Sequence, residues 1–166
     1  MILLDVNVCI FAFRQDYAQH DDARAWLTTA LEGAEAIAVA DEVLAAVVRI
    51  TTNHRTLRHP ATAATALAFC DAVRAAPAAV EIRPTHRRWE IFSRLVDHLG
   101  LRGNDVPDAF LAALALEHGA TLATYDRGFN RFPGLSVLEP DIGVGARERH
   151  AEAGLGGLTP ALSSPP

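Results

Sequence analysis

The sequence predicts an α/β fold in which a parallel sheet is covered by helices on both faces. Short apolar runs alternate along the chain with longer segments of helical periodicity, which is typical of parallel strands joined by helices. The 166 residues suffice for one domain built around a single core. Strands are expected at residues 2–4, 37–39, 80–82, 121–124 and 135–138.

Helical segments are expected between these strands. They begin near residue 6 and at residue 41, and they cover about 20–31, 60–75, 85–99 and 104–118. Thr85 and Asp41 have side chains suited to cap the helices that they precede. Three glycines stand where a helix should end: Gly33, Gly100 and Gly119.

The alternation of strands and helices stops beyond Pro140. Residues 151–166 lack periodicity and are rich in Gly, Ala, Ser and Pro. We therefore expect a folded domain over residues 1–140 and a flexible tail over residues 141–166.

The composition indicates where the protein is located and which kinds of partner are not expected. No apolar run approaches the roughly 20 residues of a membrane span, and no cationic stretch precedes an apolar run at the N-terminus. The protein is therefore expected in the cytoplasm, with no membrane partner. A formal net charge of −5 argues against a protein that coats duplex nucleic acid through its overall field.

Two residue types restrict the chemistry. All fifteen cationic side chains are arginine, so a Walker A phosphate loop and Schiff-base catalysis, which both need lysine, are excluded. Cys9 and Cys70 have the spacing of neither a zinc site nor a disulfide framework. They are expected to be small buried residues.

Four acidic residues are placed to converge. Asp5 and Asp126 follow the first and fourth predicted strands, Glu42 lies shortly after the second, and Asp108 stands near the start of an apolar helix. The carboxyl ends of parallel strands share one edge of the sheet, where ligands bind. Crowded carboxylates would raise one another's pKa, and a hard divalent cation such as Mg²⁺ removes that conflict. The sequence therefore predicts a metal-dependent phosphodiesterase.

Each aspartate taken alone also has a structural interpretation. Asp5 is suited to cap the helix that follows it, and Asp108 is favoured by the dipole at a helix start. Asp126 lies in a sequence typical of a turn. The placement of all four acids in one small domain favours the metal site.

Parts of the chain resemble a known family. Residues 1–7, MILLDVN, resemble the opening of PIN-domain ribonucleases, specifically the VapC-type toxins of toxin–antitoxin pairs. Residues 103–129 and 131–135 resemble the second half of that family, and residues 49–55 resemble a subset of it. The resemblance covers about residues 1–140. It implies a three-layer fold with a central parallel sheet and an Mg²⁺- or Mn²⁺-dependent endoribonuclease, usually dimeric and inhibited by a VapB-like antitoxin.

The resemblance also implies roles for single residues. Asp5, Asp108 and Asp126 fall on the aspartates that form the family's metal site. Asn7 and Thr124 fall on positions that orient those carboxylates, and such hydrogen bonds fix ligand geometry. A bound cation would lower the pKa of a water molecule and stabilise charge on the scissile phosphate, with one or two ions fitting the sequence equally.

One position departs from the family. The family's glutamate, one turn into the helix after the second strand, corresponds in our register to Ala46. Glu42 lies four residues earlier on the same helix face. It either serves as a fourth carboxylate that contacts the metal through water, or it is a surface acid favoured by the helix dipole. Asp105 either adds to the acidic group or helps to cap the helix that contains Asp108.

Six arginines are candidates for a basic rim around the acidic site: Arg14, Arg49, Arg55, Arg58, Arg127 and Arg131. The residues predicted to bind RNA are Arg49, His54, Arg55 and Arg127. Alanine-rich apolar helices over residues 61–79 exceed what one small core needs, and exposed apolar faces tend to be partner surfaces. A homodimer is therefore expected, with a VapB-like peptide laid over the acidic cleft.

Two other functional classes have different support in the sequence. Haloacid-dehalogenase-like phosphatases carry Asp-x-Asp after the first strand, whereas this chain has Asp5-Val-Asn7 and lacks the lysine that such enzymes and receiver domains need. The remaining alternative is a PIN-like module with a degraded site that binds RNA or a partner without cleavage. The alanine at position 46 supports that alternative.

Overall fold

Five parallel strands form the predicted sheet in a computed structural model that describes residues 1–141. The strands are β1 Ile2–Leu4, β2 Ile37–Val39, β3 Ala79–Glu81, β4 Thr121–Ala123 and β5 Val137–Leu138. They are ordered β3-β2-β1-β4-β5, which places β1 at the centre between β2 and β4. The strands β1 and β2 are buried throughout, which explains their uninterrupted apolar sequences.

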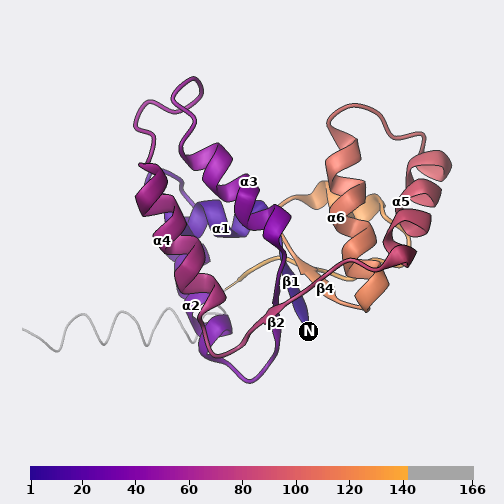
Figure 1. Cartoon of the computed structure of the whole chain (residues 1–166), viewed down its shortest axis with the longest axis horizontal. Coiled ribbons are helices and arrows are strands. Elements are labelled where there is room, and N and C mark those ends of the chain that lie inside the picture. The colour runs from indigo at the N-terminus through magenta and orange to yellow at the C-terminus, as the bar shows by residue number, and fades with distance from the viewer. Residues whose placement is uncertain (142–166) are drawn as a thin grey trace, which may run out of the picture.

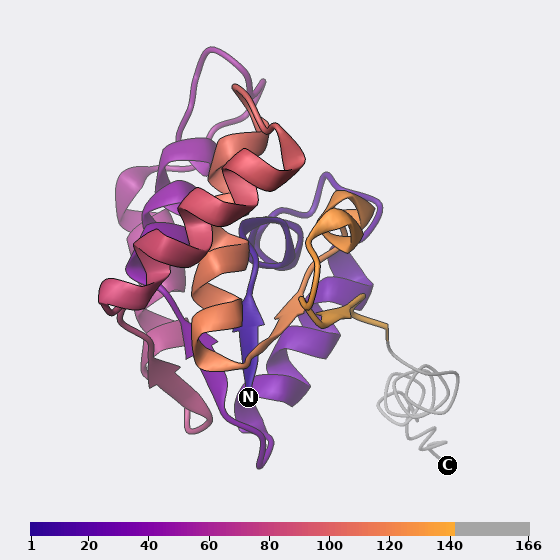
Figure 2. The ribbon, with the colours of Figure 1, turned by 90° about the vertical axis from the view of Figure 1, so that its right-hand side faces the viewer.

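Helices cover both faces of the sheet, as predicted. The helices are α1 Val6–Phe13, α2 His20–Glu32, α3 Asp41–Thr51, α4 Ala63–Arg74, α5 His86–Leu99 and α6 Asp105–His118, followed by a short 3-10 helix, η1, at Arg127–Arg131. Helices α1 to α4 lie on one side of β1, β2 and β4, and α5 and α6 lie on the other (Figure 1). Figure 2 shows α5 and α6 in front of the central strand. No helix within residues 1–141 is both long and apolar enough to cross a membrane.

The predicted helix caps are confirmed in part. The Thr85 hydroxyl accepts a hydrogen bond from the backbone N–H of Arg87 at 3.2 Å, so Thr85 caps α5. The prediction for Asp41 is wrong, because α3 begins at Asp41 itself and its carboxylate binds the guanidinium of Arg74. A residue inside the first turn favours the helix through its charge rather than by capping.

The three glycines end their helices in two different ways. Gly100 and Gly119 follow α5 and α6 with φ of 61° and 60°, the left-handed conformation that favours glycine. Gly33 follows α2 with φ of −77° and an extended backbone. Its place after α2 was predicted, but its conformation there does not require glycine.

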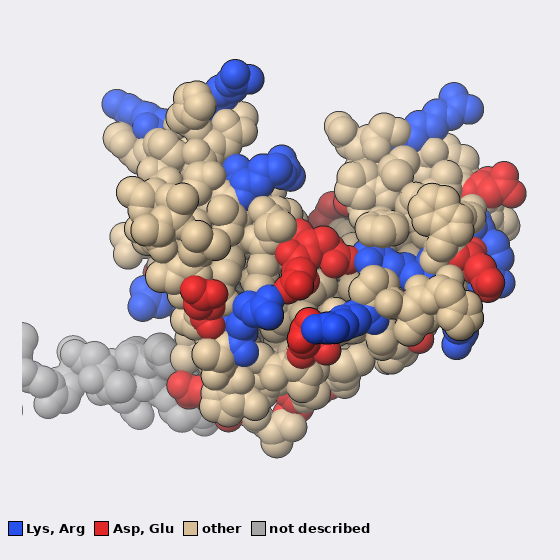
Figure 3. Space-filling view, in the orientation of Figure 1, with Lys and Arg blue, Asp and Glu red and all other residues tan. Residues whose placement is uncertain are grey.

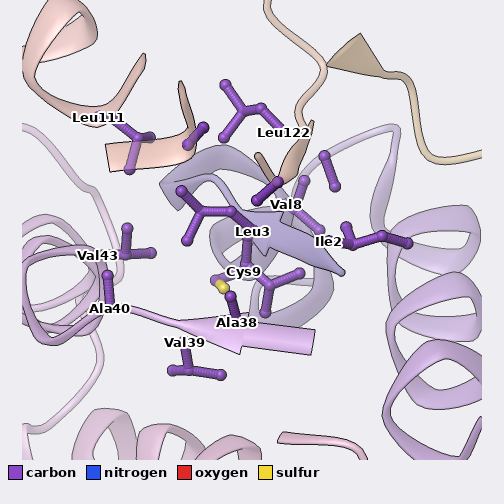
Figure 4. Packing of buried hydrophobic residues seen from close by; sticks show 14 of the residues in the cluster. Ile2, Leu3, Val8, Cys9, Ala38, Val39, Ala40, Val43, Leu111 and Leu122 are labelled. Carbon is purple, nitrogen blue, oxygen red and sulfur yellow. The ribbon is translucent and has the colours of Figure 1, made fainter. Parts of the chain in front are cut away.

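The core fixes the position of β1. The side chains of Leu3 and Leu4 are 0% and 1% exposed, and they pack among β2, β4 and the helices on both sides (Figure 4). Burying each leucine contributes about 1.5–3 kcal/mol, so the end of β1 is held firmly. Cys9 and Cys70 are buried free thiols, as predicted. Residues 142–166, which make up nearly all of the predicted tail, lie outside the described part of the chain.

Candidate functional site

Asp5 and Thr124 leave the sheet side by side. Strands β1 and β4 are parallel neighbours with Leu4 opposite Ala123, so the next residue of each strand reaches the same edge. The Thr124 hydroxyl donates a hydrogen bond to Oδ2 of Asp5 at 2.5 Å. The other carboxylate oxygen of Asp5 accepts from the backbone N–H of Val6 at 2.6 Å. Asp5 therefore caps α1, as its structural interpretation predicts, and it also lies at the carboxyl edge of the sheet, where the metal-site interpretation places it.

The Thr124 hydroxyl connects several groups at this edge. Besides donating to Asp5, it accepts hydrogen bonds from Nδ2 of Asn7 and from the backbone N–H of Asp126, both at 3.0 Å. The Asn7 side-chain oxygen accepts from the backbone N–H of Tyr125 at 3.2 Å. Asn7 and Thr124 thus form a hydrogen-bonded frame that fixes the orientation of the Asp5 carboxylate.

Asp108 lies in the first turn of α6 and faces Arg131. Its Oδ2 accepts a hydrogen bond from Nη2 of Arg131 at 2.9 Å, while Nη1 of the same guanidinium donates to Asp105 at 2.9 Å. The Asn104 cap position makes no side-chain capping bond, and Asp105 is already inside the helix. Asp105 therefore belongs to the acidic group through Arg131.

Asp126 follows β4 and its carboxylate caps η1. Its Oδ1 accepts a hydrogen bond from the backbone N–H of Gly128 at 2.7 Å, and its side chain is exposed. The charge of Asp126 nevertheless acts on both Asp5 and Asp108. Asp126 therefore lies close enough to influence the pKa values of the other two aspartates.

Burial and neighbouring charges raise the pKa values of two of these acids. Burial raises the pKa of Asp5 to about 6; hydrogen bonds from Thr124 and Val6 oppose the rise, and the charges of Asp108 and Asp126 add to it. Burial likewise raises the pKa of Asp108, opposed by Arg131 and reinforced by Asp126. A nearby cation would lower the pKa of such a buried carboxylate, because the cation favours its charged form.

Glu42 reaches the same pocket from α3. A cavity of about 190 Å³ is lined by Asp5, Glu42, Ala46, Asp108 and other residues, so Glu42 and Ala46 both border it. Acidic side chains gather at the bottom of the hollow between the two halves of the molecule (Figure 3). The Glu42 carboxylate accepts a hydrogen bond from Nη2 of Arg88, which borders the same cavity. Ala46 adds no acid there.

The chemistry of the donors fits a hard divalent cation. All the acidic side chains named here offer oxygen atoms, which Mg²⁺ and Mn²⁺ prefer. Within residues 1–141, no three His, Cys, Asp or Glu side chains are arranged so that they could hold a metal ion as they stand. In this arrangement Arg131 donates to Oδ2 of Asp108, and the backbone N–H of Gly128 donates to Oδ1 of Asp126.

Three of the four residues predicted to bind RNA lie in one region. Arg49 is exposed in the last turn of α3, and His54 and Arg55 are exposed in the segment that follows. Arginine side chains occupy the outer tips of both halves, above the acidic bottom of the hollow (Figure 3). This charge pattern suits a polyanion whose backbone contacts the rim while one phosphate enters the hollow.

Two predicted rim arginines lie elsewhere. Arg127 is 3.8 Å from the carboxylate of Glu139 and lines a separate pocket with Gln19. Arg14 is buried and donates to Asp16 and to the backbone carbonyl of His59, so its prediction as a rim residue is wrong. An arginine near a turn is often assumed to be exposed, but here it closes the turn after α1.

Arg88 also borders the cavity that Asp5 and Glu42 line, and it was not among the predicted site residues. It is 4% exposed, although arginine is rarely buried without a partner. The sequence does contain a signal: Phe92 and Leu95 stand four and seven residues after Arg88, which places the cation on the apolar stripe of α5. A charged residue within such a stripe indicates a buried ion pair.

The chain is similar to known proteins over nearly the whole described part. Residues 2–135 match the model of the PIN domain. The chain is 41% identical over 140 residues to Ribonuclease VapC43 of Mycobacterium tuberculosis, covering 84% of this chain and 95% of the relative. It is 35% identical over 142 residues to Ribonuclease VapC25 of the same organism, covering 86% and 100%.

Solved structures agree with the fold. The crystal structure of Mycobacterium tuberculosis VapC20, a sarcin-ricin loop cleaving toxin, has a TM-score of 0.60 and 17% identity, covering 84% of this chain and 100% of that chain. VapBC2 from Rickettsia felis, bound to a DNA fragment from its promoter, also has a TM-score of 0.60, with 20% identity over 83% and 98%. These likenesses concern the fold alone. Together with the match over residues 2–135, the sequence identities establish that the chain belongs to the PIN-domain family, among its VapC ribonucleases.

Proposed function

We propose that this protein is a metal-dependent endoribonuclease that acts as the toxin of a VapBC-type toxin–antitoxin pair. The observation that carries the proposal is the convergence of three aspartates: Asp5 and Asp108 line one pocket, and the Thr124 hydroxyl binds both the Asp5 carboxylate and the backbone N–H of Asp126. Relatives up to 41% identical are named ribonucleases, which supports RNA as the substrate. Acidic side chains lie at the bottom of a hollow whose outer tips carry arginines (Figure 3), which suits a nucleic acid strand.

Asp5, Asp108 and Asp126 would hold the ion, Mg²⁺ or Mn²⁺, and Glu42 would add a fourth carboxylate from the other side of the pocket. When bound, the ion supplies acidity to water and stabilises charge on the scissile phosphate. Thr124 and Asn7 keep the Asp5 carboxylate in one orientation. Unpaired or loop RNA is the expected substrate, since its bases can turn away from the phosphate that enters the site.

The proposed partner is a small VapB-like protein that covers the hollow. Several solved relatives in fold are complexes of a VapC-type chain with its antitoxin, which supports this partner. An antitoxin that inhibits the site would carry positive charge toward the acids, in the place of the cation. We also propose a homodimer and action in the cytoplasm, as the sequence predicts.

The test of the function is RNA cleavage with and without metal. Cleavage of single-stranded RNA should stop in EDTA and return with Mg²⁺ or Mn²⁺, and Asp5→Asn should abolish it, because Asp5 is the most buried of the three acids. Asp21→Asn, at an exposed acid in the first turn of α2, is the matched control and should cleave at the wild-type rate. Undiminished cleavage in EDTA would reject the metal mechanism.

One observation favours a second function. Ala46 borders the pocket without a carboxylate, as expected for a PIN-like module that binds RNA or a partner but does not cleave. The same experiment separates the two functions. RNA that binds to the wild-type protein in Mg²⁺ and Mn²⁺ but is never cut would establish the binding module.

A further inference from the structure

Arg88 places a buried positive charge at the acidic pocket. It is 4% exposed, and it borders the cavity that Asp5, Glu42 and Asp108 also line. Taking a guanidinium out of water is costly unless its hydrogen bonds are satisfied and its charge is paired. The partners of Arg88 therefore decide what this side chain does.

The helix α6 holds the guanidinium in one plane. Nε and Nη2 of Arg88 donate to the backbone carbonyl of Phe110 at 3.2 and 3.1 Å. The guanidinium carbon lies 3.6 Å from the centroid of the Phe110 ring, a cation–π contact. The Phe110 ring in turn packs edge-on against Phe92, with centroids 5.2 Å apart. Only a planar guanidinium stacks and donates in this way, so lysine would not replace it fully.

The same guanidinium reaches across the pocket to Glu42. Its Nη2 donates to Oε1 of Glu42, in the first turn of α3. Helices α3 and α5 lie on opposite sides of the central strands (Figure 1), so this ion pair joins the two halves of the molecule over the pocket. The Glu42 side chain is 38% exposed, whereas that of Arg88 is 5% exposed. The arginine is therefore the fixed member of the pair, and the glutamate is the member that is held.

We propose that Arg88 is a positioning residue that holds the Glu42 carboxylate at the acidic pocket, in place for the cation. The inference rests on the proposed function. Without Arg88, the flexible glutamate would turn toward solvent, since Asp5 and Asp108 carry the same charge. Holding it in advance removes that cost from metal binding. The pair also explains how an acid four residues before Ala46 belongs to the site.

Metal binding without RNA gives the direct test. Mn²⁺ affinity of the whole chain, measured by calorimetry and by the loss of the free-ion electron spin resonance signal, should fall about 10–100-fold in Arg88→Met. Glu42→Gln should fall by a similar factor, and the double variant should be no weaker than Glu42→Gln alone. Arg87→Met is the matched control, because Arg87 is the exposed neighbour on the same helix, and it should bind Mn²⁺ as the wild type does.

Three results would overturn the proposal. Unchanged Mn²⁺ affinity in Arg88→Met, beside a loss in Glu42→Gln, would show that Glu42 needs no help. Losses that add in the double variant would show that the two residues act independently. Tighter Mn²⁺ binding in Arg88→Met would show that Arg88 competes with the cation.

Cleavage kinetics and a conservative variant complete the test. A positioning role lowers kcat in Arg88→Met with little change in KM, whereas a rise in KM alone would make Arg88 a contact for RNA phosphate and reject the proposal. Arg88→Lys keeps the positive charge and should recover part of the Mn²⁺ affinity. If circular dichroism shows that Arg88→Met does not fold, Arg88→Lys serves as the test variant, and its Mn²⁺ affinity should lie below that of the wild type. A wild-type protein that binds Mn²⁺ with this dependence on Arg88 yet cuts no RNA would reject the proposed function and leave the positioning role intact.

Discussion

Asp5 is buried at the end of the central strand, and without a cation this burial disfavours its charged form. Its backbone position ends the central strand, so its carboxylate is 3% exposed, and that burial raises its pKa to about 6. An ordinary aspartate in the unfolded chain titrates near 3.9. The folded chain therefore binds a proton at Asp5 more readily than the unfolded chain does, and ionisation of Asp5 opposes folding.

This difference predicts the pH dependence of stability without metal. Because the folded pKa is raised, the contribution of Asp5 to stability is greatest below about pH 4 and declines as the pH rises to about 6. The whole decline is about 3 kcal/mol, at roughly 1.4 kcal/mol for each pKa unit. The free energy of unfolding of the wild type in EDTA should therefore fall relative to that of Asp5→Asn by about this amount between pH 4 and pH 7.

Urea unfolding followed by circular dichroism at the two pH values measures this gain. Added Mg²⁺ should raise the stability of the wild type at neutral pH and leave Asp5→Asn unaffected, since a ligand of the native state stabilises only a chain that binds it. An equal pH dependence in the two proteins would show that the Asp5 carboxyl is not desolvated.

The sequence identifies some residues of the candidate site and conceals others. Asp5 and Asp126 could be predicted to converge because each follows a strand, and parallel strands end at a common edge. For Arg88, the position on the apolar stripe of α5 indicates burial, but its partners could not be predicted, since they depend on how α5 packs against α6 and α3. The position of Arg14 was missed for the same reason, since its backbone partner His59 is brought to it by the tertiary structure.

At the scale of the elements, the sequence predicts the type of each segment better than its ends. Helix α4 begins at Ala63 rather than near residue 60, because the Thr62 hydroxyl accepts a hydrogen bond from the backbone N–H of Thr65 at 3.1 Å and starts the helix there. The 3-10 helix η1 was not predicted. It is a single short turn after Asp126, and its sequence also fits an ordinary turn.

The C-terminal end of α6 allows the stability contribution of a left-handed glycine to be measured. Gly119 has φ of 60°, and a Cβ atom added there would meet nothing within 4 Å. Gly119→Ala should therefore lower the free energy of unfolding by about 1–2 kcal/mol through backbone conformation alone. Gly119→Asn should lower it less, since asparagine tolerates the left-handed region better than alanine.

Chemical denaturation of the three proteins measures this order. The strand after Gly119 is β4, and Thr124 follows its last residue, Ala123. Equal stability of Gly119→Ala and Gly119→Asn would contradict the assignment of the cost to the left-handed backbone.

At the scale of the whole molecule, apolar side chains remain exposed on both halves. Leu67 on α4 is 51% exposed and Trp89 on α5 is 66% exposed. A second apolar surface, between α1, α2 and α4, is lined by Phe13, Leu27 and Phe69. Exposed apolar surface of this kind usually belongs to an interface, which supports the prediction of partners.

The homodimer prediction is tested by light scattering. At micromolar concentration the mass should be about 36 kDa, twice the 17.8 kDa of one chain. A charged substitution in the interface should return the monomer, so Leu67→Glu and Trp89→Glu together identify which half of the molecule forms it. A stable monomer of the wild-type chain would contradict the prediction.

Under the proposed function, the hydrogen bonds of Thr124 also set when the site can be complete during synthesis of the chain. They join Thr124 to Asp5 and Asn7, which precede it by 119 and 117 positions. A ribosome adds about 5–20 residues per second, so the hydroxyl that orients Asp5 is made roughly 6–24 s after Asp5 itself. Until then the central strand lacks its partner β4, and the acidic pocket is incomplete. A nuclease that would attack the cell's RNA is thus withheld from the translation machinery until its domain is nearly finished.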